Sequence, residues 1–310
     1  MNKLKRIADN PYILFGYLNK FIDFRFLPDK VFLKLKYRAS FNEKLNLNNP
    51  TTYNQKLQWL KLHDRNPLYV KLVDKYEVRN YVKNVIGEKY LIPLIKLYST
   101  YEEFETMKIS DFPDQFVIKC THDSGSVIIC KDKNNFDFEN AKLKIKKSLK
   151  KNQYYKCREW PYKNVPPRIV IEQYLKDIDS QHGLLDYKIF CFDGEPKFLY
   201  IASDREKGPK EAKVDFYDFD FNKLNVRLSN HPSSSYLFKK PKCFDEIISI
   251  SRKLSKDMPQ VRLDFYVIDN KILFGEFTFF NGGGFVPFVP SNYDSIFGKY
   301  INISNVSEEK

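Results

Sequence analysis

Apolar residues recur at helical spacing in the first part of the chain. Residues 51–84 predict two helices. Thr51 or Thr52 can cap the first helix through its hydroxyl, and Pro67 suits the first turn of the second, where its missing N–H costs nothing. The pattern therefore predicts a largely helical segment before any strand begins.

Aromatic residues mix with basic ones ahead of these helices. Phe15, Leu18, Phe21 and Ile22 fit one helical stripe. Such a stripe either docks on the protein's own core or lies in the plane of a membrane surface. Aspartates interrupt the face, which favours docking on the core, so peripheral membrane association is the most that this segment suggests.

From residue 115 onward the alternation of apolar and polar residues becomes typical of strands. The pair Asp193-Gly194 lies between two such segments and is a strong hairpin signal. Because hairpins dominate, the sheets are expected to be antiparallel or mixed. Strands are predicted at residues 115–122, 126–130, 168–175, 187–192, 196–202, 261–268 and 271–279, and amphipathic helices at 137–152 and 243–257.

The composition indicates a folded protein in a reducing compartment, and we expect a cytoplasmic one. The 310 residues, 43% of them hydrophobic, suffice for about two domains and exclude wholesale disorder. Five cysteines without a CxxC motif indicate neither a disulfide framework nor a zinc site. The apolar run at residues 12–18 is too short to span a bilayer.

The net charge of +13 suits an anionic partner. Nucleotide, nucleic acid, a membrane surface and an acidic polysaccharide all qualify, and the charge does not choose among them. A solvated helix face explains the lysines of residues 142–151 more simply than a nucleic-acid site does. We therefore expect no specific nucleic-acid partner.

Two acidic residues on adjacent predicted strands carry the most informative chemistry. Alternation places Arg262 and Asp264 on one face of their strand, and Glu276 and Thr278 share a face of the next. The intervening turn brings the strands together, so the two carboxylates can converge and hold Mg²⁺, which prefers hard oxygen ligands. The alternative is an ordinary hairpin whose carboxylates face solvent.

Three other segments carry weaker signals. Lys119 ends an apolar strand, and the small polar loop of residues 122–126 that follows can wrap phosphate oxygens with its N–H groups, although any hairpin resembles it. The strand that ends in residues 172–175 either offers backbone groups to an adenine edge or is a plain core strand. Lys188 lies on the same strand face as Asp186.

The order of these elements resembles the ATP-grasp superfamily. Residues 262–265 (Arg-Leu-Asp-Phe) and 275–278 (Gly-Glu-Phe-Thr) are similar to the Arg-x-Asp-Phe and Glu-x-Asn elements of D-alanine–D-alanine ligases. From about Tyr37 onward the chain resembles the TupA-like ATP-grasp family, known from teichuronopeptide and capsular-polysaccharide gene contexts. The matching stretches are residues 49–60, 73–79, 158–162 and 167–169.

The resemblance implies a two-substrate ligase with ATP and Mg²⁺ as cofactors. Its site residues, by implied role, are as follows: Lys75 and Lys119 neutralise ATP phosphates; His122, Ser124, Gly125 and Ser126 form a reduced phosphate loop; Glu172, Gln173, Tyr174 and Leu175 hold adenine and ribose; Lys188 lies near the transferred phosphate; Arg262 stabilises the acyl-phosphate and tetrahedral states; Asp264 and Glu276 bind the metal.

One departure from the superfamily pattern concerns the metal. The position two residues after the metal-binding Glu is usually Asn, and here it is Thr278. Thr278 can offer a neutral oxygen, and Asn281 is an alternative third ligand after a short excursion of the chain. The identity of the third ligand therefore stays open.

The resemblance also implies the fold and its division. We expect an α+β ATP-grasp fold in which two α+β lobes with antiparallel sheets clamp a nucleotide. Residues 1–70 are expected to form a helical N-terminal extension, residues 71–180 the small lobe with its approach segment, and residues 181–310 the large lobe with the metal and phosphate site.

The implied function is a carboxylate–amine ligase that forms an amide through an acyl phosphate. Family context suggests a sugar acid of a surface polysaccharide, free or as a nucleotide sugar, joined to an amino acid or amino alcohol. Alternatives are a glycan phosphotransferase or a sugar-transferring enzyme of the same pathway, and a non-catalytic polyanion-binding module. Candidate acceptor contacts are Arg158, Glu159, Trp160 and Lys163.

Overall fold

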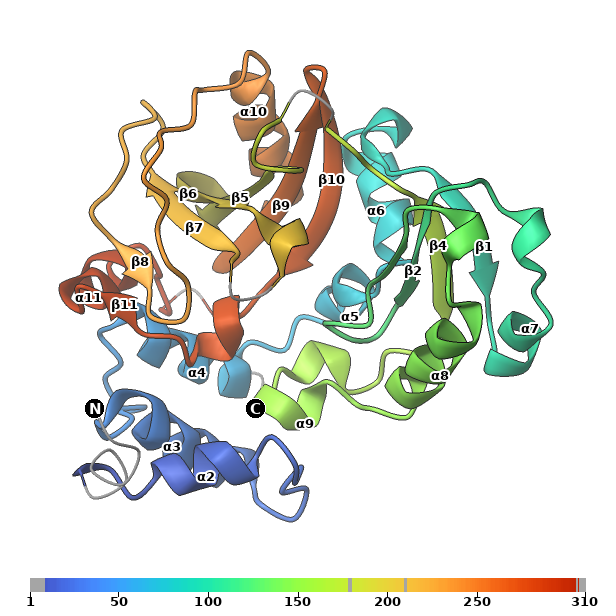
Figure 1. The fold of residues 1–310 in the computed structure, drawn as a ribbon. Helices are drawn as coiled ribbons and strands as arrows, with labels where there is room; N and C mark the ends of the chain where they lie inside the picture. Colours follow the sequence, from blue (N-terminus) through green and yellow to red (C-terminus); the bar gives the residue numbers. More distant parts are fainter. Residues whose placement is uncertain (1–8, 178–179, 209–210, 305, 307–310) are drawn as a thin grey trace.

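The computed structural model describes residues 9–177, 180–208, 211–304 and 306, which combine helices with antiparallel sheets. A small sheet and a larger one lie beside each other, and the N-terminal helices α2 and α3 lie at one end of the molecule (Figure 1). The predicted α+β architecture with antiparallel sheets is therefore confirmed. None of the helices in these described ranges is long and apolar enough to cross a membrane.

The small sheet has four antiparallel strands in the order β1-β4-β2-β3. Helix α8 packs on it because its Ala141 and Ile145 side chains are buried with the sheet, and the Asp137 side chain caps its first turn. The bounds are β1 (Leu94–Tyr98), β2 (Phe116–Cys120), β3 (Ile128–Cys130), β4 (Ile169–Gln173), α7 (Tyr101–Glu105) and α8 (Phe138–Leu149).

The large sheet has five antiparallel strands in the order β10-β9-β5-β6-β7. Its hairpins turn where the sequence predicts, since Asp193-Gly194 and Asp269-Asn270 all have the positive φ that a two-residue turn of this kind requires. The bounds are β5 (Asp186–Phe192), β6 (Glu195–Ser203), β7 (Lys213–Tyr217), β9 (Gln260–Ile268) and β10 (Lys271–Thr278).

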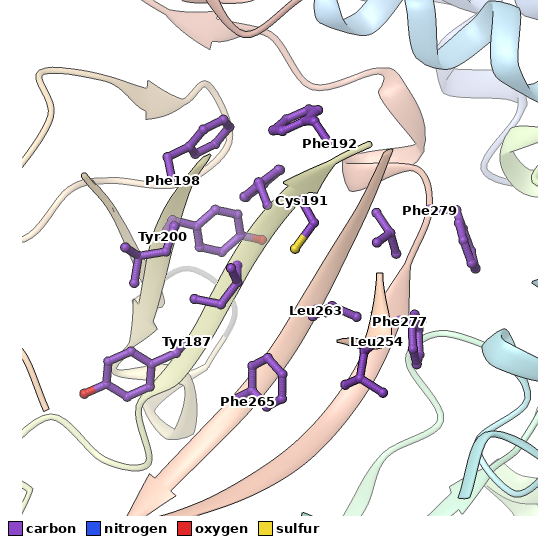
Figure 2. Close-up of a cluster of buried hydrophobic side chains, with 14 of the residues drawn as sticks. Tyr187, Cys191, Phe192, Phe198, Tyr200, Leu254, Leu263, Phe265, Phe277 and Phe279 are labelled. Carbon is purple, nitrogen blue, oxygen red and sulfur yellow. The ribbon is translucent and has the colours of Figure 1, made fainter. Parts of the chain in front are cut away.

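Aromatic side chains fill the core around the large sheet (Figure 2). Phe190 of β5 stacks on Phe198 of β6 with ring centroids 4.6 Å apart. Helix α10 (Phe244–Leu254) contributes Ile247 and Leu254, both fully buried, to the same core. This packing holds β5 and β9 rigidly, and those two strands carry much of the polar site described below.

The predicted pair of helices at residues 51–84 is in fact three helices. Thr52 caps the first, as expected, by accepting from the Gln55 N–H. The second prediction was too long because the chain leaves helical geometry at Asp74, whose carboxylate pairs with Arg168 at 2.6 Å and accepts the Tyr76 N–H. The helices are α4 (Tyr53–His63), α5 (Leu68–Val73) and α6 (Val78–Val85).

The helical stripe predicted at residues 15–22 is helical only in α2 (Ile13–Leu18), and the 13-residue helix α3 (Asp29–Phe41) lies within the expected helical extension. Other elements have no counterpart in the sequence prediction, because they are too short to show a period. They are α9 (Tyr154–Cys157), α11 (Asn292–Gly298) and the strand pair β8 (Arg227–Leu228) with β11 (Phe288–Val289), besides β1 and β7. Val78 and Val82 of α6 belong to the core of the large sheet. The boundaries expected between the helical extension, the small lobe and the large lobe, at residues 70 and 180, stay predictions.

Candidate active site

A cavity of about 290 Å³ lies between the two sheets. Strands β2, β3 and β4 supply one wall, and β5, β9 and β10 supply the other. Its lining combines apolar side chains with four cationic and five acidic ones. The charged lining residues are Lys75, Lys119, Lys188, Arg205, Glu172, Asp186, Glu206, Asp264 and Glu276.

Strand register brings the predicted carboxylates together. Asp264 of β9 lies opposite Glu276 of β10, and Arg262 lies opposite Thr278. On the other side of β9, Asp264 lies opposite Lys188 of β5. Directly paired residues point to the same face of a sheet, so the five side chains form one polar group, of which Lys188, Asp264 and Glu276 line the cavity and Arg262 and Thr278 lie behind them. The convergence expected from alternation is therefore present.

Arg262 is the centre of this group. Its Nε and Nη2 donate to the two carboxylate oxygens of Asp264, each at 2.7 Å, which is the bidentate geometry of a strong pair. Nη2 also donates to Thr278 Oγ1 at 2.9 Å, and Nη1 to Asn281 Oδ1 at 2.6 Å. Glu276 Oε1 is farther, at 3.5 Å. Arg262 thus ties β9 to β10 and to the loop after it.

Lys188 links Asp264 to a second acidic residue. Its Nζ contacts Asp264 Oδ2 and lies 2.7 Å from Asp186 Oδ2. Arg205, in the loop after β6, donates to the same Asp186 oxygen at 2.6 Å. Cations and carboxylates therefore alternate along this wall, from Arg262 through Asp264, Lys188 and Asp186 to Arg205.

Burial and charge set the protonation states of this wall. Burial raises the pKa of Asp264, but the positive charges of Arg262 and Lys188 outweigh it and leave that pKa below its ordinary value. Burial lowers the pKa of Lys188, yet Asp186 and Asp264 outweigh it and raise that pKa. Asp264 and Lys188 are consequently ionised at neutral pH.

The small-sheet wall carries one close ion pair. Lys119 Nζ of β2 donates to Glu172 Oε2 of β4 at 2.6 Å, and Arg79 lies 3.6 Å from the other Glu172 oxygen. Burial lowers the pKa of Lys119, but the charge of Glu172 more than compensates and raises it. Lys75 also lines the cavity, and its Nζ donates to the Asp123 carbonyl.

The rest of the lining is mostly apolar or aromatic. The predicted nucleotide-contacting residues Glu172, Gln173, Tyr174 and Leu175 all line the cavity. Val127 and Ile129 lie on the opposite side of their strand from the core and are 49% and 41% exposed. The lining is completed by Ile92, Val117, Leu184, Tyr266 and Gly275. The lining therefore combines apolar surface, which suits a flat heteroaromatic ring, with cations, which suit phosphate.

The predicted phosphate loop lies beside the cavity, and none of its four residues lines it. Ser124 and Gly125 are exposed. His122 is buried, and its Nε2 lies within 3.3 Å of the carbonyls of Ser148, in the last turn of α8, and Lys151, just after that helix. Ser126 Oγ donates to Asp123 Oδ1 and accepts from the Cys120 N–H. His122 and Ser126 therefore fix the shape of the loop, whose exposed tip is the part left free to meet a phosphate.

The four predicted acceptor contacts do not line the cavity either. Arg158 is 1% exposed, and its guanidinium donates to the Phe24 carbonyl at 2.8 Å and pairs with Asp29 at 3.1 Å. The expectation that Arg158 contacts a substrate is thus replaced by a structural role, because its donors serve the N-terminal segment. These contacts with the N-terminal segment could not be predicted from the position of Arg158 near Trp160 in the sequence.

The neighbours of Arg158 have separate surroundings. Glu159 is buried, which raises its pKa. The Trp160 ring stacks on Tyr69, with centroids 5.9 Å apart, and the Arg65 guanidinium lies over it. Lys163 is exposed, with its ammonium near the Tyr154 ring. Trp160 thus packs a loop onto the core, and a substrate role for Glu159 or Lys163 stays a prediction.

The donor chemistry allows a divalent cation at Asp264 and Glu276. Both carboxylates line the cavity, and the Glu276 side chain is 45% exposed. Thr278 and Asn281 do not line it, and Asn281 Oδ1 already accepts from Arg262. Within the described ranges no three His, Cys, Asp or Glu side chains group as a metal site. Two carboxylates beside substrate phosphates fit Mg²⁺, which keeps few protein ligands.

Arg205, Glu206 and Arg79 were not predicted from the sequence. Arg205 and Glu206 follow β6 in a short turn that begins at Asp204, whose positive φ of 55° redirects the chain toward the cavity. Arg79 reaches Glu172 from α6. No sequence period marks such residues, because their positions depend on loop conformation and helix packing.

Comparison with known proteins gives one family match and several similar solved structures. A family model described as TupA-like ATPgrasp matches residues 55–302. D-alanine–D-alanine ligase from Helicobacter pylori is 15% identical, with a TM-score of 0.45, and the match covers 82% of this chain and 70% of that one. No curated protein matches the sequence.

Two further solved structures are similar over part of their length. D-alanine–D-alanine ligase from Bacillus anthracis is 15% identical with a TM-score of 0.37, and the match covers 67% of this chain and 56% of that one. The ATP-grasp ligase PsnB, solved with a minimal precursor, Mg and ADP, is 8% identical with a TM-score of 0.36, over 73% and 57% of the two chains. The chain thus spans little more than half the length of either. The family match itself extends from α4 to beyond α11 and includes every charged residue of the cavity, and the chain therefore belongs to the TupA-like ATP-grasp family.

Proposed function

We propose that the protein is an ATP-dependent carboxylate–amine ligase that forms an amide through an acyl phosphate. The observation that carries the proposal is the shared cavity. Lys119 and Glu172 face it from one sheet, and Lys188, Asp264 and Glu276 face it from the other. Membership of the ATP-grasp family supports the use of ATP as the activating substrate.

The apolar and the charged lining residues of the cavity suit the two ends of ATP. The apolar side chains of Ile92, Leu175 and Leu184 can enclose the adenine ring, beside the strand end at Gln173. Lys75 and Lys119 line the cavity, where their positive charge would offset the accumulated negative charge of the phosphates. The exposed loop tip at Ser124 and Gly125 supplies N–H groups that can close over them.

The large-sheet wall supplies the reacting end. Asp264 and Glu276 would hold Mg²⁺, which would neutralise part of the phosphate charge. Arg262 and Lys188 are fixed by carboxylates, so they stay oriented while the γ-phosphoryl group moves to the substrate carboxylate. The amine nitrogen then attacks the acyl carbon, phosphate leaves, and the amine gives up a proton. The products are an amide, ADP and phosphate.

The substrates are proposed from the family context. The acid would be a sugar acid of a surface polysaccharide, as a free sugar, nucleotide sugar or polymer, and the amine would be an amino acid or amino alcohol. A cytoplasmic setting would supply the ATP. The basic surface of the chain, with its net charge of +13, suits an acidic glycan.

The test is ADP release from Mg-ATP with panels of acids and amines, followed by mass spectrometry of the products. We expect ADP only when both an acid and an amine are present, and a product mass equal to their sum less water. ADP formed with a hydroxyl acceptor alone would identify a phosphotransferase. Salt-sensitive polyanion binding without ATP affinity would identify a binding module.

A variant links this activity to the cavity. Arg262→Lys keeps the charge but loses the planar fork that engages both Asp264 oxygens. We expect ATP binding, measured by calorimetry, to persist while kcat falls strongly. Unchanged kcat in this variant would remove Arg262 from the reaction.

A further inference from the structure

Exposed large apolar side chains gather at the N-terminal end of the molecule. Eight of the fifteen such side chains among the described residues lie between positions 12 and 31. Phe21 is 88% exposed and Phe26 is 78% exposed. We call this set the N-terminal face; its residues are Tyr12, Leu14, Tyr17, Leu18, Phe21, Ile22, Phe26 and Val31.

The exposure follows from how the segment folds. Helix α2 buries no residue completely and ends at Leu18, so Phe21 and Ile22 lie in the following loop rather than on a helical stripe. Phe15 turns inward instead, with its ring centroid 4.7 Å from Phe24 and 5.5 Å from Phe32. The stripe expected to dock on the protein's own core thus divides, and only Phe15 of its four residues packs inward.

The loop that carries Phe21 and Phe26 is fastened from behind. Arg158 donates to the carbonyls of Phe24 and Leu27, and Asp29 accepts from the Tyr154 hydroxyl at 2.6 Å. The guanidinium of Arg158 also lies 4.2 Å from the centre of the Phe32 ring. These buried contacts hold the backbone of the loop while leaving the two phenyl rings outside.

Basic side chains accompany the apolar ones. Lys20, Arg25, Lys30 and Lys34 are exposed within the same stretch of chain. Arg25 pairs with the exposed Asp23 at 2.9 Å, and the three lysines have no carboxylate ion pair among the described residues. The N-terminal face therefore combines protruding aromatic rings with excess positive charge.

We propose that the N-terminal face docks onto an anionic lipid bilayer and lies in the interfacial plane. Isolated protruding phenyl groups fit a deformable acyl layer, and the surrounding lysines fit anionic head groups. A second copy of this chain would bring like charges together, which disfavours self-association through the same face. The lower end of the molecule, with α2 and α3, would thus rest on the membrane (Figure 1).

The test uses the full chain and large unilamellar vesicles, either of phosphatidylcholine alone or with phosphatidylglycerol added. We expect sedimentation with the anionic vesicles and much weaker sedimentation with the neutral ones. The double substitution Phe21→Ser, Phe26→Ser should weaken binding roughly a hundredfold, because burial of one phenyl side chain is worth about tenfold or more. Substitution Lys20→Gln should weaken it about fivefold.

The matched control is Leu237→Ser, which removes an apolar side chain that is 74% exposed outside the N-terminal face. We expect it to bind anionic vesicles as the unmodified chain does. Thermal unfolding of each variant checks that the fold is retained. Equal vesicle binding by the double variant and the control would overturn the proposal, and so would a dimer in solution that the double variant converts to monomer.

Discussion

The large-sheet wall of the cavity carries a chain of alternating charges from Arg262 to Arg205, whereas the small-sheet wall carries one close pair, Lys119 with Glu172. On the large sheet, Asp264 is 1% exposed and has two cationic partners. On the small sheet, Lys119 is partly exposed. The difference indicates that the large-sheet wall is fixed before a ligand binds. In the small-sheet wall, Lys119 can exchange Glu172 for a ligand group when a ligand binds.

This contrast has a physical consequence. Removal of one member from a buried charge group leaves its partners unsatisfied at low effective dielectric, so the cost falls on both folding and chemistry. In the small-sheet pair Glu172 is buried but Lys119 is partly exposed, so Lys119 can instead recruit water or a phosphate. We therefore expect substitutions in the large-sheet wall to change stability and turnover, and substitutions in the small-sheet wall to change mainly the affinity for nucleotide.

The largest combined effect, on both stability and turnover, is expected for Asp264→Asn. It leaves Arg262 and Lys188 buried beside a neutral amide, which should cost about 3 kcal/mol of unfolding free energy and reduce turnover at least about a hundredfold. Urea unfolding and single-turnover ADP formation measure the two effects. Normal stability would contradict the picture of a preformed wall, and partial rescue by high Mg²⁺ would support the metal role.

Glu276→Gln should separate the effect on stability from the effect on turnover. The Glu276 side chain is 45% exposed and lies 3.5 Å from Arg262, so its loss should hardly change the unfolding free energy. Ligase activity should nevertheless be abolished, because hard cations prefer a charged oxygen. Activity close to normal at limiting Mg²⁺ would remove Glu276 from the metal site.

Lys119→Ala tests the small-sheet wall. The substitution removes a cation that faces the cavity and leaves Glu172 with Arg79 as its remaining partner. We expect the transition state to lose about 3 kcal/mol of stabilisation, with a large rise in KM for ATP and little change in acceptor affinity. Steady-state kinetics at varied ATP measure this split; an unchanged KM would show that Lys119 serves only the ion pair.

The pH dependence of stability should distinguish the unmodified chain from Asp264→Asn. The folded-state pKa of Asp264 lies below its ordinary value of 3.8, because Arg262 and Lys188 overcome the effect of burial. Its contribution is therefore present above about pH 4 and is lost as the pH falls through the folded-state pKa. The difference in unfolding free energy between the two proteins should be constant near neutral pH and narrow below that point in acid unfolding experiments.

The smallest effect is expected for Lys131→Ala. Lys131, just after β3, donates to Glu206 at 2.6 Å and so joins the two sides of the cavity at its rim. Both side chains are substantially exposed, so the unfolding free energy should change by about 0.5 kcal/mol or less. A larger loss would mean that this pair helps to hold the two sheets together.

The sequence by itself determined the hairpins and the pairing of Asp264 with Glu276. These depend on alternation along a strand and on turn residues such as Asp269 and Asn270, which are local properties. It also determined the family, since the order of modest motifs is preserved along the chain. A strand register fixed by a tight turn leaves the side chains little choice of face.

Only the tertiary structure decided which partners the side chains of distant segments contact. It directed Arg158 to the carbonyls of the loop at residues 24–27, brought Arg205 to Asp186, and left Phe21 outside the core. The sequence pattern around Arg158 and Trp160 fits a ligand site as well as it fits the structural role that these side chains have. Contacts between segments far apart along the chain depend on how helices and loops pack against the sheets, and that packing has no period that a linear sequence displays.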